Sequence, residues 1–200
     1  MLKRIAGAVA LILLAACKPE NRSGLPETET TGTVQSVQET TTASATTTGE
    51  SGGTLSAMTT EDKEFVVKAG MGGLYAVQAG NLALQNASSP DVRSFAQRMV
   101  TDHAKANAEL AQLATAKGLA LATELAGDHE MAVEHLKTLS GAEFDKAFME
   151  HMVSDHASDV AEFEKASTSA TDADLKAWAG RTLPTLREHE RLAKAVAGRV

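Results

Sequence analysis

Apolar residues recur at helical spacing over most of the chain after residue 59. Between Pro90 and Gly118 the larger apolar side chains fall within a sector of about 60° when each residue advances about 100° around the helix axis. They are Phe95, Met99, Ala106, Leu110 and Leu113. A second stripe, marked by Phe148, Met152 and Phe163, follows Ser140. Because β-branched runs are almost absent from 59–200, the pattern predicts an all-α domain there.

Helix punctuation divides this domain into five segments. The predicted helix starts are Thr60, the Ser89–Pro90 pair, and the capping boxes Ser140–Glu143 and Thr171–Asp174. Gly118 can close the second helix, and a short third helix is expected over 128–139. Pro184 lies inside the fifth segment and predicts a kink or a split there.

Small residues crowd the first predicted helix, in "AGMGGLYAVQAG". No strand precedes them and no P-loop Lys-Ser/Thr follows, so a phosphate-binding loop is not indicated. Small residues at these spacings instead favour close approach of a second helix.

Two stretches nearly repeat each other, "MVTDHAKANAEL" and "MVSDHASDVAEF", and each carries an Asp-His pair at a margin of its apolar stripe. The pairs are Asp102–His103 and Asp155–His156. Two helix pairs joined by a crossover build a ferritin-like bundle. We therefore expect a ferritin-like up-down four-helix bundle with an additional C-terminal helix, in which an internal twofold makes the second and fourth helices antiparallel.

A third histidine, His189, lies on the stripe of the last helix, so three histidines are expected to face the interior. In a structural interpretation, Asp102 bonds His156 and Asp155 bonds His103 across the bundle. In a functional one, the same five side chains (Asp102, His103, Asp155, His156 and His189) hold an iron, zinc or copper ion. The sequence favours the structural interpretation, because valines 100 and 153 stand where the Glu-x-x-His motif of di-iron proteins needs glutamate.

The N-terminus has the features of a lipoprotein signal. Residues 1–16 combine a basic start with a short apolar run and end in Leu-Ala-Ala before Cys17, the chain's one cysteine. We expect cleavage before Cys17 and lipid on its sulfur, with Lys18 favouring the outer membrane. Residues 17–58 are rich in Thr, Ser and Gly and predict a disordered tether, which leaves 59–200 as the folded domain.

Charge narrows the range of partners. Removing 1–16 takes away Lys3 and Arg4 and no acidic residue, which changes the formal net charge from −7 to −9. An acidic chain without a basic cluster argues against binding to nucleic acid or anionic lipid. Membrane attachment is therefore expected through the lipid alone.

Three stretches together resemble a known bacterial family. They are "FAQRMVTDHAKANAELAQLA", "LSGAEFDKAFMEHMVSDHASDVAEFEKA" and "LKAWAGRTLPTLREHERLAKAV", and they resemble the domain of unknown function 4142 family. The resemblance spans about 60–196 and implies a ferritin-like fold and an outer-membrane or exported location. It places the family's histidines on His103, His156 and His189. Ala76 stands where relatives usually have a glutamate in the first helix, and the family supplies no established activity.

The sequence thus predicts an envelope lipoprotein whose bundle is a non-catalytic binding or structural module, with a role in stress tolerance. The alternative is a metal-binding, redox-active protein using the inward-facing His and Asp residues. No nucleophile–base constellation and no substrate path can be identified in the sequence, so it offers no positive sign of an enzyme.

Overall fold

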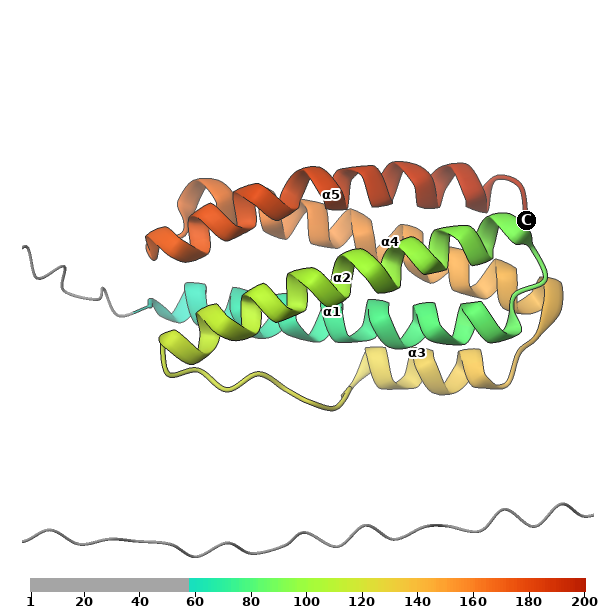
Figure 1. Cartoon of the computed structure of the whole chain (residues 1–200), viewed down its shortest axis with the longest axis horizontal. Coiled ribbons are helices and arrows are strands. Elements are labelled where there is room, and N and C mark those ends of the chain that lie inside the picture. Colours follow the sequence, from blue (N-terminus) through green and yellow to red (C-terminus); the bar gives the residue numbers. More distant parts are fainter. Residues whose placement is uncertain (1–57) are drawn as a thin grey trace, which may run out of the picture. The chain divides into compact units, whose positions relative to one another are not determined.

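The structure, a computed structural model of the chain, describes residues 58–200 (Figure 1). They form five helices: α1 (Thr60–Asn86), α2 (Pro90–Ala116), α3 (Asp128–Lys137), α4 (Gly141–Ser169) and α5 (Ala173–Ala197). The predicted all-α fold is confirmed. The signal peptide, Cys17 and all of the tether except Met58 lie outside the described residues, and Met58 itself packs into the core at 6% exposure.

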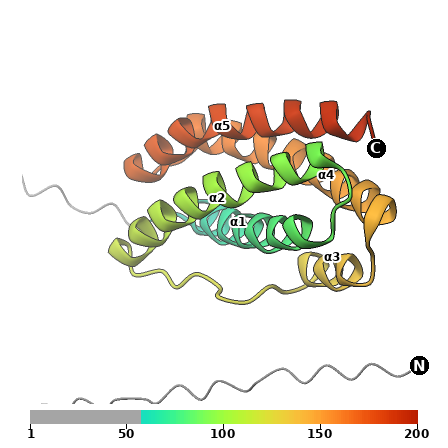
Figure 2. The same cartoon turned by 45° about the vertical axis from the view of Figure 1, so that its right-hand side comes forward.

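The four long helices form the bundle, and the short helix α3 packs outside it against α1 and α4 (Figures 1 and 2). Helix α1 contacts α2 and α4, and α5 contacts the same two, so α2 and α4 lie on one diagonal. The predicted four-helix bundle is confirmed, with the C-terminal helix inside it and α3 as the additional element.

The diagonal helices α2 and α4 run in the same direction (Figure 1). Asp145 near the start of α4 accepts a hydrogen bond from the backbone N–H of Ser88, just before α2. At the other end, Nζ of Lys117, which follows α2, lies 2.6 Å from Oδ2 of Asp172, which follows α4. The expected antiparallel arrangement is therefore wrong, because residues 117–140, including α3, return the chain to the end where α2 began.

The helix starts follow the predicted capping chemistry with two exceptions. The side chains of Thr59, Ser89 and Asp172 each accept a hydrogen bond from a backbone N–H in the first turn of their helix. Asp172, and not Thr171, is thus the cap of α5. Ser140 makes no side-chain capping bond, and α4 begins at Gly141, whose φ of 63° suits glycine. Gly118 closes α2 as predicted, with φ 71°.

Helix α5 continues without a break through Pro184, so the predicted split is wrong. Pro184 itself is exposed, while Leu183 and Leu186 beside it are buried in the bundle. Tertiary packing on the inner face therefore holds the helix together despite the missing backbone donor.

The small residues of α1 allow it to approach α2 closely, as predicted. A Cβ atom on Gly73 would lie 1.9 Å from Oδ1 of Asn107, and one on Gly80 would lie 2.8 Å from Cγ2 of Val100. The Asn107 amide is the movable end of a side chain, but the Ala96 carbonyl oxygen also lies 3.3 Å from the Gly80 position, so Gly80 limits the spacing of the two helices.

The hydrophobic core consists of two clusters along the bundle. In α4, one includes Phe144 through Met152 and the other Phe163 and Ala166. The same gap occurs in the other two helices. In α2 the first cluster ends at Met99 and the second begins at Leu110, and in α5 the second ends at Leu186 and the first resumes at Ala193. A polar layer therefore crosses the bundle at its centre.

Each end of the bundle is closed by a buried aspartate. Asp145 of α4 accepts hydrogen bonds from the backbone N–H groups of Ser88 and Ser89, in the α1–α2 turn. Asp62 of α1 accepts from the backbone N–H groups of Thr171 and Asp172, in the α4–α5 turn. Each helical hairpin thus supplies a carboxylate that completes the turn of the other.

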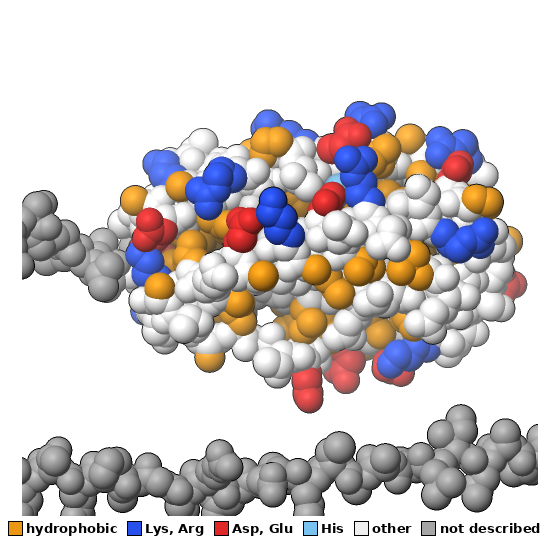
Figure 3. Space-filling model, viewed as in Figure 1, with side chains coloured by type: hydrophobic (Ala, Val, Ile, Leu, Met, Phe, Trp, Pro, Cys, Tyr) orange, Lys and Arg blue, Asp and Glu red, His pale blue; other side chains and the backbone are white. Residues whose placement is uncertain are grey.

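The surface shows no strong segregation of charge on the face in Figure 3, where basic and acidic side chains are interspersed. Within residues 58–200, none of the helices combines the length and the apolar character needed to cross a bilayer.

Candidate metal centre

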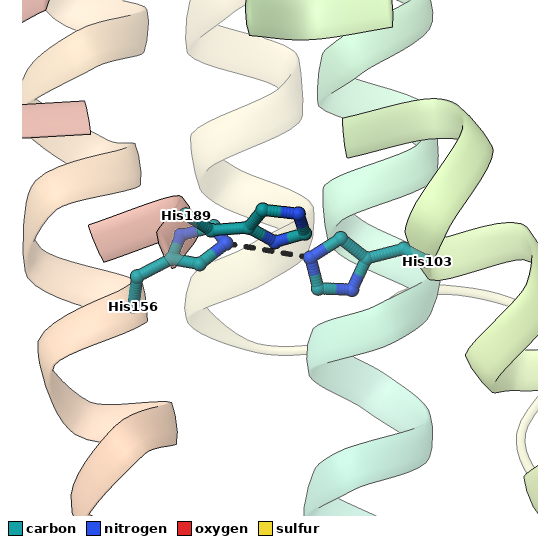
Figure 4. Close-up of side chains that lie close together, drawn as sticks. All are labelled: His103, His156 and His189. Atoms are coloured by element: carbon teal, nitrogen blue, oxygen red, sulfur yellow. Dashed lines mark hydrogen bonds between the residues drawn. The ribbon is translucent and has the colours of Figure 1, made fainter. Parts of the chain in front are cut away.

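The polar layer at the centre of the bundle is made by three histidines that converge from three helices (Figure 4). They are His103 of α2, His156 of α4 and His189 of α5, with exposures of 5%, 1% and 0%. Their ring centroids are 5.3 to 5.5 Å apart, and one nitrogen of each lies within 4.8 Å of the others. The inward orientation predicted for all three is confirmed.

Hydrogen bonds assign the tautomer of His156. Its Nδ1 donates to the carbonyl oxygen of Met152 at 2.9 Å, so its Nε2 carries a lone pair. Nε2 of His103 is 3.3 Å away and donates to it. The two rings are thus bonded to each other, and neither bonds to the neighbouring pair's aspartate.

His189 has the opposite tautomer. Its Nε2 donates to Oδ2 of Asp102 at 2.8 Å, which leaves the lone pair on Nδ1. That Nδ1 is buried and has no hydrogen-bond partner among the described residues. An unsatisfied acceptor at this depth normally costs free energy, so it marks a position where a ligand would be favourable.

The predicted exchange of Asp-His partners is wrong for both aspartates. Asp102 bonds His189 of α5, and Asp155 bonds no histidine: its Oδ2 is buried without a partner among the described residues. The reason is the diagonal placement of α2 and α4. A side chain at the margin of a helix's core face reaches the adjacent helix, which is α5 for Asp102 and α1 for Asp155.

Burial keeps the three rings neutral. Desolvation lowers the pKa of His103 well below its usual value, and the neighbouring imidazoles lower it further. Desolvation also lowers the pKa of His156 to about 4. It lowers that of His189 as well, against the opposing effect of the hydrogen bond to Asp102. At neutral pH all three are therefore in the form that binds metal.

A groove of about 540 Å³ lies beside the centre, between α1 and α4 with α3 at its edge. His156 and Met152 line it, but His103 and His189 do not. Asp155 and Asp159 also line it, and desolvation raises the pKa of both, that of Asp159 to about 7.

The sequence pattern did not indicate two of the groove residues, Tyr75 and Asp159. Tyr75 of α1 is 1% exposed, and its ring packs on His129 of α3 at 4.7 Å between centroids. Asp159 lies one helical turn after Asp155 on the same face of α4. That spacing of four residues was a detectable signal, but the sequence did not show that Asp159 faces α1, where a Cβ on Gly72 would lie 3.5 Å from its Oδ1 in ordinary contact.

The donor set fits one transition-metal ion and not a dinuclear cluster. Nε2 of His156 and Nδ1 of His189 carry lone pairs, and Nε2 of His103 gains one when its proton moves to Nδ1. Helix α1 supplies no ligand, because position 76 is a buried alanine. Within residues 58–200 this is the one convergent group of three or more His, Cys, Asp or Glu donors.

Solved structures with this architecture are distant in sequence. A DUF305 fragment from Deinococcus radiodurans is 18% identical with a TM-score of 0.63, covering 72% of this chain and 99% of that one. A DUF305 protein from Streptomyces coelicolor is 16% identical with a TM-score of 0.57, covering 66% and 89%. CopM in its Cu(I)-bound form is 15% identical with a TM-score of 0.56, covering 67% and 93%. These likenesses show a shared fold.

No curated protein matches the chain. The family comparison is decisive, since residues 46–196 match the domain of unknown function DUF4142. The match confirms the resemblance inferred from the Asp-His and Leu-Pro-x-Leu-x-x-His motifs. The chain belongs to the DUF4142 family.

Proposed function

We propose that this domain is a non-catalytic metal-binding module that holds a single copper ion between His103, His156 and His189. The observation that carries the proposal is the buried, partnerless Nδ1 of His189, on a ring that offers one nitrogen within 4.8 Å of a nitrogen on each of the other two rings. A purely structural polar layer would satisfy that atom.

The charge around the centre favours Cu(I). Three neutral imidazoles contribute no charge, and among the described residues Asp102, bonded to His189, is the one carboxylate in hydrogen-bond contact with the ring set. Asp102 is itself paired with Arg98, at 3.6 Å between Oδ2 and Nε, so a monovalent ion would leave less uncompensated positive charge among the buried rings than a divalent ion. Met99 and Met152, both fully buried, lie one turn before two of the histidines on the same helix faces.

Similarity of fold gives further support for copper. CopM shares the bundle architecture and has been solved in both Cu(I)- and Cu(II)-bound forms. Imidazole ligands also suit zinc and iron, which the experiment below must compare with copper.

The cellular setting that we propose is the outer membrane of the cell envelope. Lipid on Cys17 would anchor the chain, and residues 17–58 would hold the bundle away from the bilayer, in the periplasm. Storage of copper in this compartment would contribute to tolerance of metal stress. All three imidazoles are at most 5% exposed, which suits retention of an ion better than turnover of a substrate.

Metal content tests the proposal. The full chain is purified without chelator or histidine tag, and bound metal is measured by elemental analysis after exposure to Cu(I), Cu(II), Zn(II) or Fe(II). We expect one copper per chain in the wild type and none in a His103→Ala/His156→Ala variant. A His135→Ala/His151→Ala variant is the matched control, because it removes two histidines that lie outside the centre.

Circular dichroism must show that the first variant keeps its helices. A folded wild-type protein that takes up none of the four ions would contradict the proposal and leave the histidines as a structural layer. For the anchor, labelled palmitate should enter the wild type and not Cys17→Ser, and label in both proteins would contradict lipidation at Cys17.

A further inference from the structure

The groove between α1 and α4 gives the metal centre one open side. His156 is 1% exposed and yet lines the groove, together with Met152 below it. The other two histidines do not line it. Any ion that reaches the centre from this side therefore meets His156 first.

The groove carries an excess of negative charge, although burial raises the pKa of Asp159 to about 7 and leaves part of that carboxyl group protonated at neutral pH. Four carboxylates line it: Asp128, Asp155, Asp159 and Glu162. Lys68 is the one lysine among the lining residues, and its Nζ donates a hydrogen bond to Oε1 of Glu162 at 2.8 Å. A concave surface with excess charge of one sign attracts ions of the other sign and raises their association rate.

Buried polar atoms along the groove lack partners. Tyr75 is 1% exposed, and its Oη has no hydrogen-bond partner among the described residues. The same is true of Oδ2 of Asp155, the residue immediately before His156. Both oxygens can bind a cation or the water that it carries, and both belong to residues that line the groove together with His156.

Asp159 connects the groove with the far side of the centre. It lines the groove and also a cavity of about 20 Å³ that is lined by His103 and Trp178. The groove donors do not converge as the three histidines do. This arrangement suits passage of an ion better than its retention.

We propose that the groove is the access route of the metal ion, in which Asp155 and Asp159 hold the cation before it passes to His156. The inference rests on the proposed metal centre. Because a route is used in both directions, its loss should slow binding and release together and change the affinity much less.

Stopped-flow fluorescence of the full chain tests the route, with copper in the oxidation state that the wild type takes up in the metal-content experiment. Trp178 is the only tryptophan and shares a cavity with His103, so bound copper should quench it. At pH 8, where Asp159 is mostly ionised, we expect the association rate to fall about tenfold in Asp155→Asn/Asp159→Asn and its dependence on salt to weaken. Glu190→Gln is the matched control: Glu190 acts electrostatically on His156 but does not line the groove, and less than about a twofold change is expected.

A second pair of variants adds charge at exposed positions, where folding is not at risk. Ser158→Lys places a cation in the groove lining, and Ser154→Lys places one on a turn of α4 outside it. Only Ser158→Lys should slow uptake. Unchanged rates in the groove variants, or equal slowing by the controls, would overturn the route while leaving the metal content of the protein intact. Absence of copper in the wild type would instead overturn the proposed function.

Discussion

Asp102–His103 and Asp155–His156 have the same local sequence and opposite surroundings. Asp102, whose side chain is 33% exposed, bonds His189 of α5, and His103 is buried away from the groove. Asp155 faces α1 with a partnerless buried oxygen, and His156 borders the groove. The aspartate of the first pair has a histidine partner, whereas the aspartate of the second pair has none among the described residues.

The difference arises from the neighbouring helices. Helix α5 presents His189 to Asp102. Helix α1 instead presents Gly72, Ala76 and the ring of Tyr75 to the groove beside the second pair. A repeated motif therefore predicts where a side chain points, but the facing helix determines what it does. The following predictions test how far the two pairs differ.

The largest expected effect is loss of the ligand in the second pair. His156→Ala should lower the affinity for Cu(I) by more than about 100-fold, because an outer-shell partner alone is commonly worth about 10- to 100-fold. His151→Ala, which removes the other α4 histidine, should change it little. Competition with a chromophoric Cu(I) chelator measures both, and equal affinities in the two variants would contradict a role for His156 as ligand.

Acid should destabilise the apo-protein through the buried histidines of the centre, and His156 of the second pair is one of them. The pKa of His156 is about 4 in the folded state and about 6.5 when unfolded, so the unfolded chain binds more protons between these values. The contribution of His156 to the free energy of unfolding is therefore complete above pH 6.5. It falls by up to roughly 3 kcal/mol as the pH is lowered to about 4. Urea titrations from pH 4 to 7.5 measure it.

Asp159 has the opposite effect on how the free energy of unfolding depends on pH. Its pKa is raised to about 7, so its contribution to stability is present below about 4 and is lost as pH rises to 7. The pH dependence should be steeper in Asp159→Asn and flatter in His156→Gln than in the wild type. Identical curves for the three proteins would show that neither side chain is as buried as described.

Affinity for copper should also separate the two aspartates. Asp102→Ala removes the hydrogen bond that orients His189 and should weaken Cu(I) binding by about 10- to 100-fold. Asp155→Ala touches no ligand hydrogen bond and should change the affinity by less than about threefold. The chelator competition used for His156→Ala compares them directly, and a reversed order would contradict the assigned network.

The smallest expected difference is in stability without metal. Asp102→Ala leaves the Nε2–H of His189 buried and unpaired, at a cost of about 1–2 kcal/mol. Asp155→Ala removes an oxygen that already lacks a partner and should lie within about 0.5 kcal/mol of the wild type. Urea unfolding at pH 7 measures both, and a larger loss for Asp155→Ala would reveal a partner for that carboxylate.

Periodicity and capping chemistry predicted the helices and the inward orientation of His103, His156 and His189. They did so because both depend on residues a few positions apart. The pairing of Asp102 with His189 joins residues 87 positions apart and depends on which helices are adjacent. The path of the chain through 117–140 decides that adjacency, and no local pattern encodes it. The groove likewise depends on which residues of α1 and α3 lie opposite α4, and these are more than a few positions away from the α4 residues in the sequence.

The reciprocal end contacts have a consequence for how the domain assembles. The α1–α2 turn is completed by Asp145 of α4, and the α4–α5 turn by Asp62 of α1. Neither hairpin contains all the acceptors that its own turn needs. Separated halves of the chain would therefore each leave backbone donors unsatisfied, and the bundle should fold as a single cooperative unit that two complementary fragments could restore only by associating.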